Sequence, residues 1–236
     1  MNYYIFGDSF GEDNYDMDWL WYHRIDGKVI NDSLGCTGVK RNLKKLEERR
    51  PVDTNIIFLL TNKHRLIWPF IKHREHNEDC HQALSGPLHE GLDYILEYEK
   101  EIKLVYNMFG DDVQKSIFNT ILYLYFWTKK YNCKTLILNC DEPEPTRFED
   151  DYYFFNCETF KVHRRNLMDV CAKEFDNGII NPETEKNRYN HLTPENHEVV
   201  YNIVSNFFSG TNYSENFHEG ILQGAREGDF QRFIYE

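Results

Sequence analysis

The chain lacks a long apolar run. None of its segments approaches the ~20 consecutive apolar residues that a membrane-spanning helix needs. Its first ten residues, MNYYIFGDSF, hold neither the basic segment nor the apolar stretch of a secretory signal peptide. We therefore expect a soluble, cytoplasmic protein that binds no membrane.

Basic residues and paired cysteines are also scarce. Lys and Arg number 27 against 39 Asp and Glu, a net charge of -12, which disfavours binding to the phosphates of nucleic acid. The six cysteines include no C-x-x-C pair, so we interpret them as reduced thiols. With 41% hydrophobic and 16% aromatic residues in 236, the chain can bury a core of one large domain.

Short β-rich runs alternate with helical stretches along the chain. This alternation predicts an α/β fold with a mainly parallel sheet that carries helices on both faces. The expected strands are 3–6, 28–31, 55–60 and 135–138, with 150–155 as a fifth, edge strand or else an aromatic platform. The expected helices cover 16–24, the basic stretch through Lys44 and Leu46, 91–108, 113–131, 164–175 and 194–208.

Three further segments are interpreted from their composition. Residues 64–89 are rich in His and acids and hold two prolines, which predicts an irregular excursion that forms a lid or a wall of a cleft. His73, His76, Cys80 and His81 are metal-ligand types there, but their spacing fits no zinc signature, so we expect no metal. The aromatic run 123–127 is interpreted as core, and 209–236 as an arm that packs on this chain or on a second copy.

A serine follows the first strand directly. In parallel sheets, functional groups lie in loops beyond the carboxyl ends of the strands. Ser9 has this position, and a nucleophilic serine needs a base and donors for an oxyanion. His191 can supply the base, and Gly35 and Asn62, in the loops after the second and third strands, can supply the donors.

These residues resemble the SGNH (GDSL-type) hydrolases, which are serine esterases and lipases. Gly7-Asp8-Ser9-Phe10-Gly11 is similar to the first block of that family, Gly35-Cys36-Thr37 to the second, Thr61-Asn62 to the third, and Asn190 to His197 to the last. The spacing from Thr61 to Arg65 is similar to that in phage-encoded members. The resemblance covers 3–208 in order and implies a three-layer, flavodoxin-like domain over 1–208 with about five strands, followed by an extension over 209–236.

The resemblance also implies a role for each residue. Ser9 is the nucleophile and His191 the base; Ser9 N–H, Gly35 N–H and the Asn62 side chain form the oxyanion hole, with Asp8 and Arg65 in support. Gly38 competes with Gly35, and His197 with His191, although His197 falls inside the last predicted helix and is interpreted as a packing or surface residue.

Two positions depart from the family pattern. Arg188 stands three residues before His191, where the family has an acid, and Leu60 stands where the third block has a glycine. A missing acid leaves three readings open: a Ser9–His191 dyad, substitution by Glu185 or Glu183, or a site that has lost catalysis.

We therefore expect a serine esterase that hydrolyses a short-chain acyl or carbohydrate O-acetyl ester, needs no cofactor, and forms homo-oligomers through its extension. The alternative from another class is a catalytically degenerate binding or virion assembly protein, with a location on the virion.

Overall fold

A computed structural model of the chain describes residues 1–8, 10–11, 20–35, 37–61, 65–72, 79–83, 117–140, 155–163, 165–167, 170, 192, 194–211 and 217, with the main chain alone for 65–72, 79–83 and 194. Within this part of the chain the architecture is α/β, as the sequence predicts.

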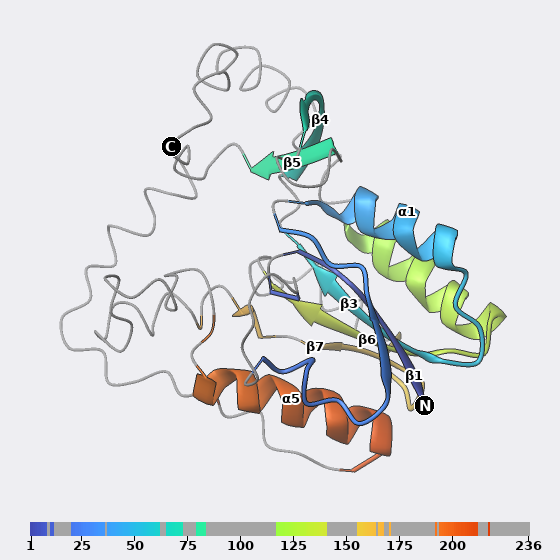
Figure 1. Cartoon of the computed structure of the whole chain (residues 1–236). Coiled ribbons are helices and arrows are strands. Elements are labelled where there is room, and N and C mark those ends of the chain that lie inside the picture. Colours follow the sequence, from blue (N-terminus) through green and yellow to red (C-terminus); the bar gives the residue numbers. More distant parts are fainter. Residues whose placement is uncertain are drawn as a thin grey trace.

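A parallel sheet of five strands forms the centre of the molecule (Figure 1). The strand order is β2-β1-β3-β6-β7, and every pair in it is parallel. The strands are β1 (Asn2–Phe6), β2 (Lys28–Asn31), β3 (Asn55–Leu60), β6 (Lys134–Asn139) and β7 (Phe160–His163). The first four confirm the strands predicted from the sequence.

The fifth strand of the sheet lies outside the segments predicted to be strands. It is β7, Phe160–His163, whereas Phe155 lies before it and 150–154 are outside the described residues. The segment 160–163 holds only four residues, two of them polar, so its own sequence is a weak strand signal. Pairing with β6 from Thr135↔Phe160 to Leu138↔His163 decides its conformation instead.

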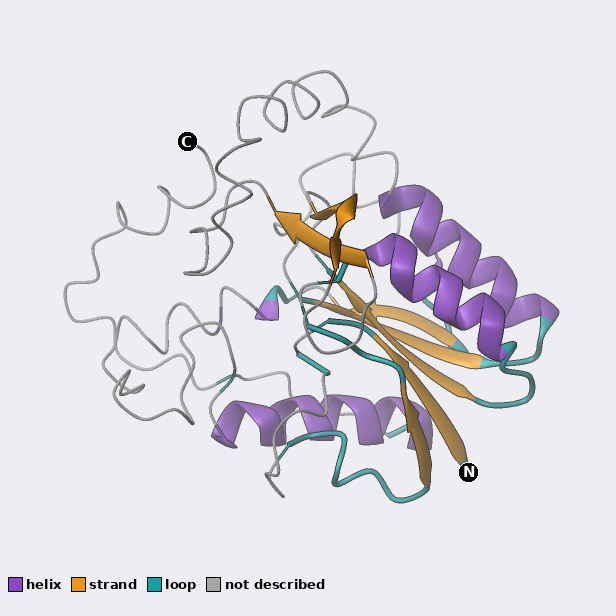
Figure 2. Cartoon of the chain, turned by 45° about the horizontal axis from the view of Figure 1, so that its top comes forward, coloured by secondary structure: helices purple, strands orange, loops and turns teal. Residues whose placement is uncertain are grey.

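Helices cover both faces of the sheet (Figures 1 and 2). On one face, α1 (Val39–Arg49) and a helix over 117–130 enclose a core that includes Leu46, Phe58 and Ile121. On the other face, α5 (Pro194–Ser209) packs with the segment 20–22. Because β3 lies in the middle of the sheet, all six of its residues are buried, which explains its continuous apolar sequence NIIFLL.

The prediction of a helix through residue 24 is wrong. Residues 20–24 form turns, in which His23 N–H donates to Leu20 O at 3.0 Å. Trp21 is almost fully buried, and its indole N–H donates to Phe10 O at 3.0 Å. Tertiary contacts therefore determine the backbone conformation of this segment. Residues 12–19 lie outside the described part, and so does the predicted helix 91–108.

The excursion after β3 contains regular structure. β4 (Arg65–Lys72) and β5 (Asp79–Ala83) form an antiparallel two-stranded sheet, which corrects the prediction that 64–89 is irregular. The register shifts between Ile67 and Lys72, the part of β4 that contains Pro69, a residue that cannot donate a main-chain hydrogen bond to a neighbouring strand. Figures 1 and 2 both place this hairpin beyond the carboxyl end of β3.

Two helix predictions need refinement. Arg165 and Asn166 are not helical, and the helix expected to start at 164 begins at Leu167, with Val170 the next described residue of it. In the 117–130 helix, Ile117, Ile121 and Leu124 are buried. However, Phe126 is 60% exposed and Tyr123 36% exposed, so the run 123–127 is not all core, since five consecutive helical residues cover more than one face.

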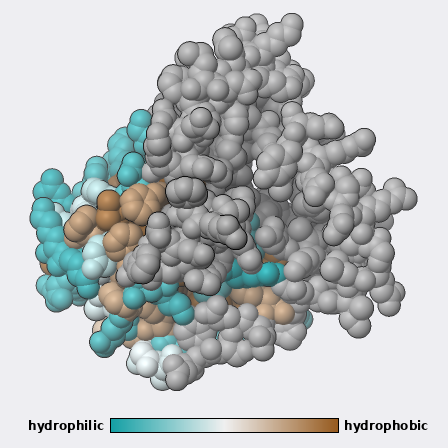
Figure 3. All heavy atoms as spheres, turned by 180° about the vertical axis from the view of Figure 1, so that it is seen from behind, coloured by the Kyte–Doolittle hydropathy of each residue, from teal (hydrophilic) through white to brown (hydrophobic). Residues whose placement is uncertain are grey.

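Apolar atoms therefore reach the surface on the side of the molecule that carries α1 and the 117–130 helix (Figure 3). Within the described residues, none of the helices combines the length and the apolar character that crossing a bilayer requires. In the predicted extension, Phe217 contacts His163 edge-on, with ring centroids 6.3 Å apart, so the tail packs on its own chain at this point.

Candidate active site

The turn after β1 is held by its own aspartate. Asp8 is fully buried, and its Oδ1 accepts the Phe10 N–H at 3.2 Å. Gly11 N–H donates to Asp8 O at 3.0 Å, which closes the turn. This side-chain bond to the main chain two residues on is an Asx turn. Ser9 itself lies outside the described residues, but both of its covalent neighbours belong to this buried turn.

Two glycines let the turn pack directly on β3. A Cβ atom on Gly7 would lie 2.6 Å from Leu59 Cβ, and one on Gly11 would lie 2.6 Å from Leu59 Cδ1. Real Cβ atoms do not approach other atoms so closely. Gly7 is therefore required by the close approach of the turn to the central strand, whereas a Cβ on Gly11 would meet the ends of the Leu59 and Ser33 side chains.

The loop after β2 joins the same turn. Leu34 N–H donates to Gly7 O at 3.0 Å. The Thr37 hydroxyl lies 2.6 Å from Leu34 O and 3.3 Å from Gly7 O. Gly35, the predicted oxyanion donor, lies between these residues and is buried. Its competitor Gly38 is the N-cap residue of α1, with φ -112°.

An asparagine links the outer part of the turn to this loop. Asn31 ends β2, its Nδ2 donates to Gly11 O at 2.6 Å, and its Oδ1 accepts the Ser33 N–H at 3.0 Å. Asn31 is not among the residues predicted to form the site. An asparagine directly after an apolar strand run and ahead of a glycine loop is the signal that could have identified it.

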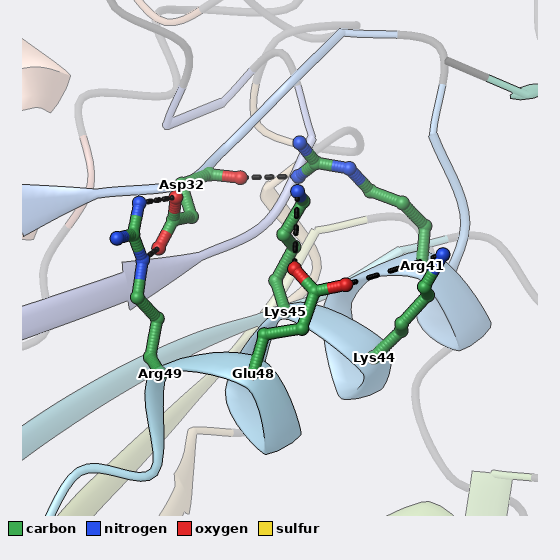
Figure 4. A network of polar contacts seen from close by, with 6 residues as sticks. All are labelled: Asp32, Arg41, Lys44, Lys45, Glu48 and Arg49. Atoms are coloured by element: carbon green, nitrogen blue, oxygen red, sulfur yellow. Dashed lines mark hydrogen bonds and ion pairs between the residues drawn. The ribbon is translucent and has the colours of Figure 1, made fainter.

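The loop is also anchored to α1 (Figure 4). Arg49 donates from Nε and Nη2 to the two Asp32 carboxylate oxygens at 2.6 and 2.7 Å, and Arg41 donates to the Asp32 main-chain oxygen. The Asp32 hydrogen bond is the main reason that the pKa of Arg49 is raised above its ordinary value. Such a two-point pair fixes orientation as well as distance.

The carboxyl end of β3 and the residues just before α5 are the other two places where the sequence predicts site residues. Thr61 directly follows β3 and is fully buried. Leu192 is buried in the same apolar cluster as Ile5, Phe10 and Trp21. Asn62 and His191, the bonded neighbours of Thr61 and Leu192, lie outside the described residues, as do Glu183, Glu185 and Arg188. Arg65 begins β4 and pairs with Ala83, and its side chain is not described.

His197 packs in the interior, which is one of the two positions predicted for it. It is 5% exposed, and its Nδ1 accepts the Trp21 N–H at 3.4 Å. Because the Trp21 indole donates to Phe10 O, a chain of hydrogen bonds runs from α5 through Trp21 to the turn after β1. The beginning of α5 is thereby tied to the turn that carries Ser9.

Further polar groups lie buried at this edge of the sheet. Among the described residues, Ser33 Oγ, Thr61 Oγ1 and both amide atoms of Asn42 lack a hydrogen-bond partner. Ser33 and Thr61 follow β2 and β3, and Asn42 belongs to α1, which begins at the same edge. Native proteins satisfy nearly all buried polar groups, so these atoms are natural partners for bound water or a polar ligand.

The described part of the chain contains no cluster of three His, Cys, Asp or Glu side chains able to hold a metal ion. Of the residues 73–81, Cys80 and His81 lie in β5, where the main chain alone is described, and His73 and His76 are outside the described part. The expectation that they bind no metal stays a prediction.

The described cysteines Cys133, Cys140 and Cys157 are thiols and not disulfides, as predicted. Cys133 and Cys140 are buried, while Cys157 is exposed. Burial opposes ionisation of Cys157. Nevertheless its pKa is lowered overall, because the Thr159 hydroxyl at 3.5 Å, main-chain N–H groups and Lys129 Nζ at 3.7 Å favour the thiolate.

The strand order indicates where a sheet of this kind would bind a ligand. The chain passes from β1 to β2 on one side of β1 and then crosses to β3 on its other side. The direction in which strands are added to the sheet therefore reverses between β1 and β3. Open α/β sheets bind ligands in the crevice outside the carboxyl ends of the strands at such a reversal. The described residues of the turn at 7–11, and Thr61 directly after β3, border this position.

Comparisons with known proteins add no relative: no family model, no curated protein and no solved structure matches this chain.

Proposed function

We propose that the chain is a serine ester hydrolase with a three-layer, flavodoxin-like fold of the SGNH type. Ser9 is the nucleophile, His191 the general base, and the N–H groups of Ser9 and Gly35 with the Asn62 side chain bind the oxyanion. The strand order β2-β1-β3-β6-β7 supports the fold assignment, since it is the doubly wound order in which the second strand lies at the edge beside the first.

One observation carries the proposal. The described neighbours of Ser9, Gly35 and Asn62 gather at the carboxyl ends of β1 and β3: Asp8 and Phe10 flank Ser9, the loop of Gly35 bonds to Gly7 O, and Thr61 follows the strand beside β1. The beginning of α5, which follows His191 in the chain, is tied to the same turn through His197 and Trp21.

The proposed reaction is acyl transfer to water. Ser9 Oγ attacks the carbonyl carbon while His191 takes the hydroxyl proton, and the carbonyl oxygen becomes an oxyanion. The intermediate collapses, the bond to the alcohol breaks, and His191 gives its proton to the leaving oxygen. Water then attacks the acyl-serine with the same assistance, which releases the acid and restores Ser9.

An acid beside His191 holds the ring in the tautomer that can accept the Ser9 proton. Because Arg188 occupies the usual position of this acid, we assign the role to Glu185. Replacement of Glu185 by Gln tests the assignment, since a dyad without an acid predicts no change in kcat. The substrates that fit the proposal are esters of short acyl chains, including O-acetyl groups on carbohydrates.

The test compares the wild-type protein with Ser9→Ala on p-nitrophenyl acetate, together with labelling by a fluorophosphonate. Loss of the nucleophile of a serine triad costs about 10⁶ in kcat, so turnover and labelling should both vanish. Ser209→Ala is the matched control, because this hydroxyl bonds to Asn206 O at the far end of α5. Folded wild-type protein that neither turns over the ester nor reacts would refute the proposal and favour the non-catalytic binding or virion assembly protein.

A further inference from the structure

We infer that Asn31 is a positioning residue for this reaction: it fixes the turn that carries Ser9 relative to the loop that carries Gly35. The inference rests on the proposed function and extends it. Its basis is the placement of the two main-chain oxyanion donors on separate loops, after β1 and β2, so that their distance depends on whatever joins the loops.

The Asn31 side-chain amide forms one hydrogen bond to each of the two loops. Nδ2 donates to Gly11 O in the first loop, and Oδ1 accepts Ser33 N–H in the second, at 2.6 and 3.0 Å. A side-chain amide offers a donor and an acceptor at once, whereas a carboxylate only accepts. An asparagine at this position therefore meets a requirement that aspartate, its nearest relative in shape, cannot meet.

The two ends of the turn are held differently. At Gly7, the carbonyl oxygen accepts both Leu34 N–H and the Thr37 hydroxyl, and the β1–β2 pairing continues through Asp32 N–H to Ile5 O at 2.9 Å. At Gly11, the hydrogen bond to the second loop that the described residues provide comes from Asn31. Loss of this bond removes the contact between the outer end of the turn and the second loop, while the turn keeps its contacts with that loop at Gly7 and with Trp21 at Phe10 O.

The second loop supplies a fixed reference for this contact. Asp32, the residue after Asn31, accepts hydrogen bonds from Arg49 at its carboxylate and from Arg41 at its main-chain oxygen, and both arginines belong to α1 (Figure 4). The position of the turn that carries Ser9 therefore depends, through Asn31, on the position of α1. Oxyanion donors act through preorganised geometry, and the loss of one costs about 10²–10³ in kcat. Misplacing the turn by about 1 Å can cost about 10².

The experiment uses Asn31→Asp in the full chain. This variant keeps the acceptor for Ser33 N–H but places an acceptor against Gly11 O, so it breaks the bond between the loops and spares the bond within one. Asn132→Asp is the matched control, since its Nδ2 donates to Asp53 Oδ1 at 2.8 Å in turns that precede β3 and β6, at the opposite edge of the sheet. Both variants lose one amide donor and gain one negative charge.

We expect Asn31→Asp to lower kcat on p-nitrophenyl acetate by about 10- to 100-fold, with KM within about two-fold and fluorophosphonate labelling slowed by a similar factor. Asn132→Asp should keep kcat within about two-fold of wild type, by the usual independence of remote sites. Circular dichroism at the assay temperature verifies that each variant is folded. Hydrogen exchange at Gly11 N–H should speed up in Asn31→Asp alone, a readout that does not depend on turnover.

Each contrary result overturns the inference in a recognisable way. If Asn31→Asp keeps wild-type kcat while Ser9→Ala is inactive, the proposed function stands and the positioning role falls. Equal losses in both Asp variants would mean a general effect of charge or stability. A raised KM with unchanged kcat would assign Asn31 to substrate binding. If the wild-type protein is inactive, the proposed function fails, and the catalytic role of Asn31 fails with it.

Discussion

Replacing Gly7 by alanine tests the packing on which the site depends. The added Cβ would lie 2.4 Å from Leu59 Cδ1 and 2.6 Å from both Cβ and Cγ of Leu59. Rotation of the leucine side chain can move Cδ1 and Cγ, but Cβ is fixed to the main chain of the central strand. The contact with Cβ must widen from 2.6 Å to at least 3.4 Å, where ordinary contact begins, so one of two backbones has to shift.

The cost follows from this displacement. Overpacking a well-filled core by one methyl group costs about 1–3 kcal/mol, and a clash with main-chain-bound atoms belongs at the upper end of that range. For a chain of this size, each kcal/mol lowers Tm by about 2–4 °C. We therefore expect Gly7→Ala to lose about 3 kcal/mol in urea unfolding and to lower Tm by roughly 6–12 °C.

Two comparisons make this prediction sharp. Gly210→Ala has nothing within 4 Å of its Cβ but has φ +76°, so it should cost only the ~1 kcal/mol of a left-handed alanine. Leu59→Ala removes Cγ and Cδ1 but keeps Cβ, so combining it with Gly7→Ala should relieve part of the clash and not all of it. A Gly7→Ala protein within ~0.5 kcal/mol of wild type would refute the close approach of the turn to β3.

Two further predictions concern titrating groups. Burial and the hydrogen bond to Glu47 raise the pKa of Tyr123 to about 12. Absorbance titration should therefore show a late tyrosinate step, which Tyr123→Phe removes and Glu47→Gln moves toward pH 10. Because the folded protein holds this proton more tightly than the unfolded chain, the stabilisation is complete below about pH 10 and is lost as the pH rises toward 12. Among Cys133, Cys140 and Cys157, iodoacetamide should modify Cys157 first, and Lys129→Met should shift the pH profile of Cys157 alkylation to higher pH. Burial raises the pKa of Cys133, so alkylation of Cys157 that is slower than that of Cys133 would contradict this prediction.

The central elements could be predicted because local pattern and tertiary environment agree there. Asn55–Leu60 is apolar throughout, and the structure buries it on both faces. Lys28–Asn31 is bounded by Gly27, whose φ of +153° suits the turn before the strand. In α5, Pro194 opens the helix where a proline is tolerated at the first position.

The elements that sequence reasoning missed depend on distant partners. Phe160–His163 is a strand because β6 offers it a free edge, and residues 20–24 are turns because Trp21 reaches Phe10 and His197. At the site, family resemblance selects Ser9 and Gly35, but it does not identify Asn31 and Thr37. Their contribution is a set of bonds to carbonyl oxygens at Gly7 and Gly11, and no local pattern encodes a partner 20 or 30 residues away.

The position of β3 also bears on the order in which the sheet assembles. On one side β3 pairs with β1, and 48 residues connect Phe6 to Asn55; on the other it pairs with β6, and 73 residues connect Leu60 to Lys134. Closing the longer connection costs only about 0.4 kcal/mol more chain entropy, so the order of synthesis is the larger difference between the two sides. During synthesis, β1, β2 and β3 leave the ribosome well before β6. The turn at 7–11, the Asn31 side chain and the loop of Gly35 thus belong to the part of the sheet that is complete before β6 and β7 are synthesised.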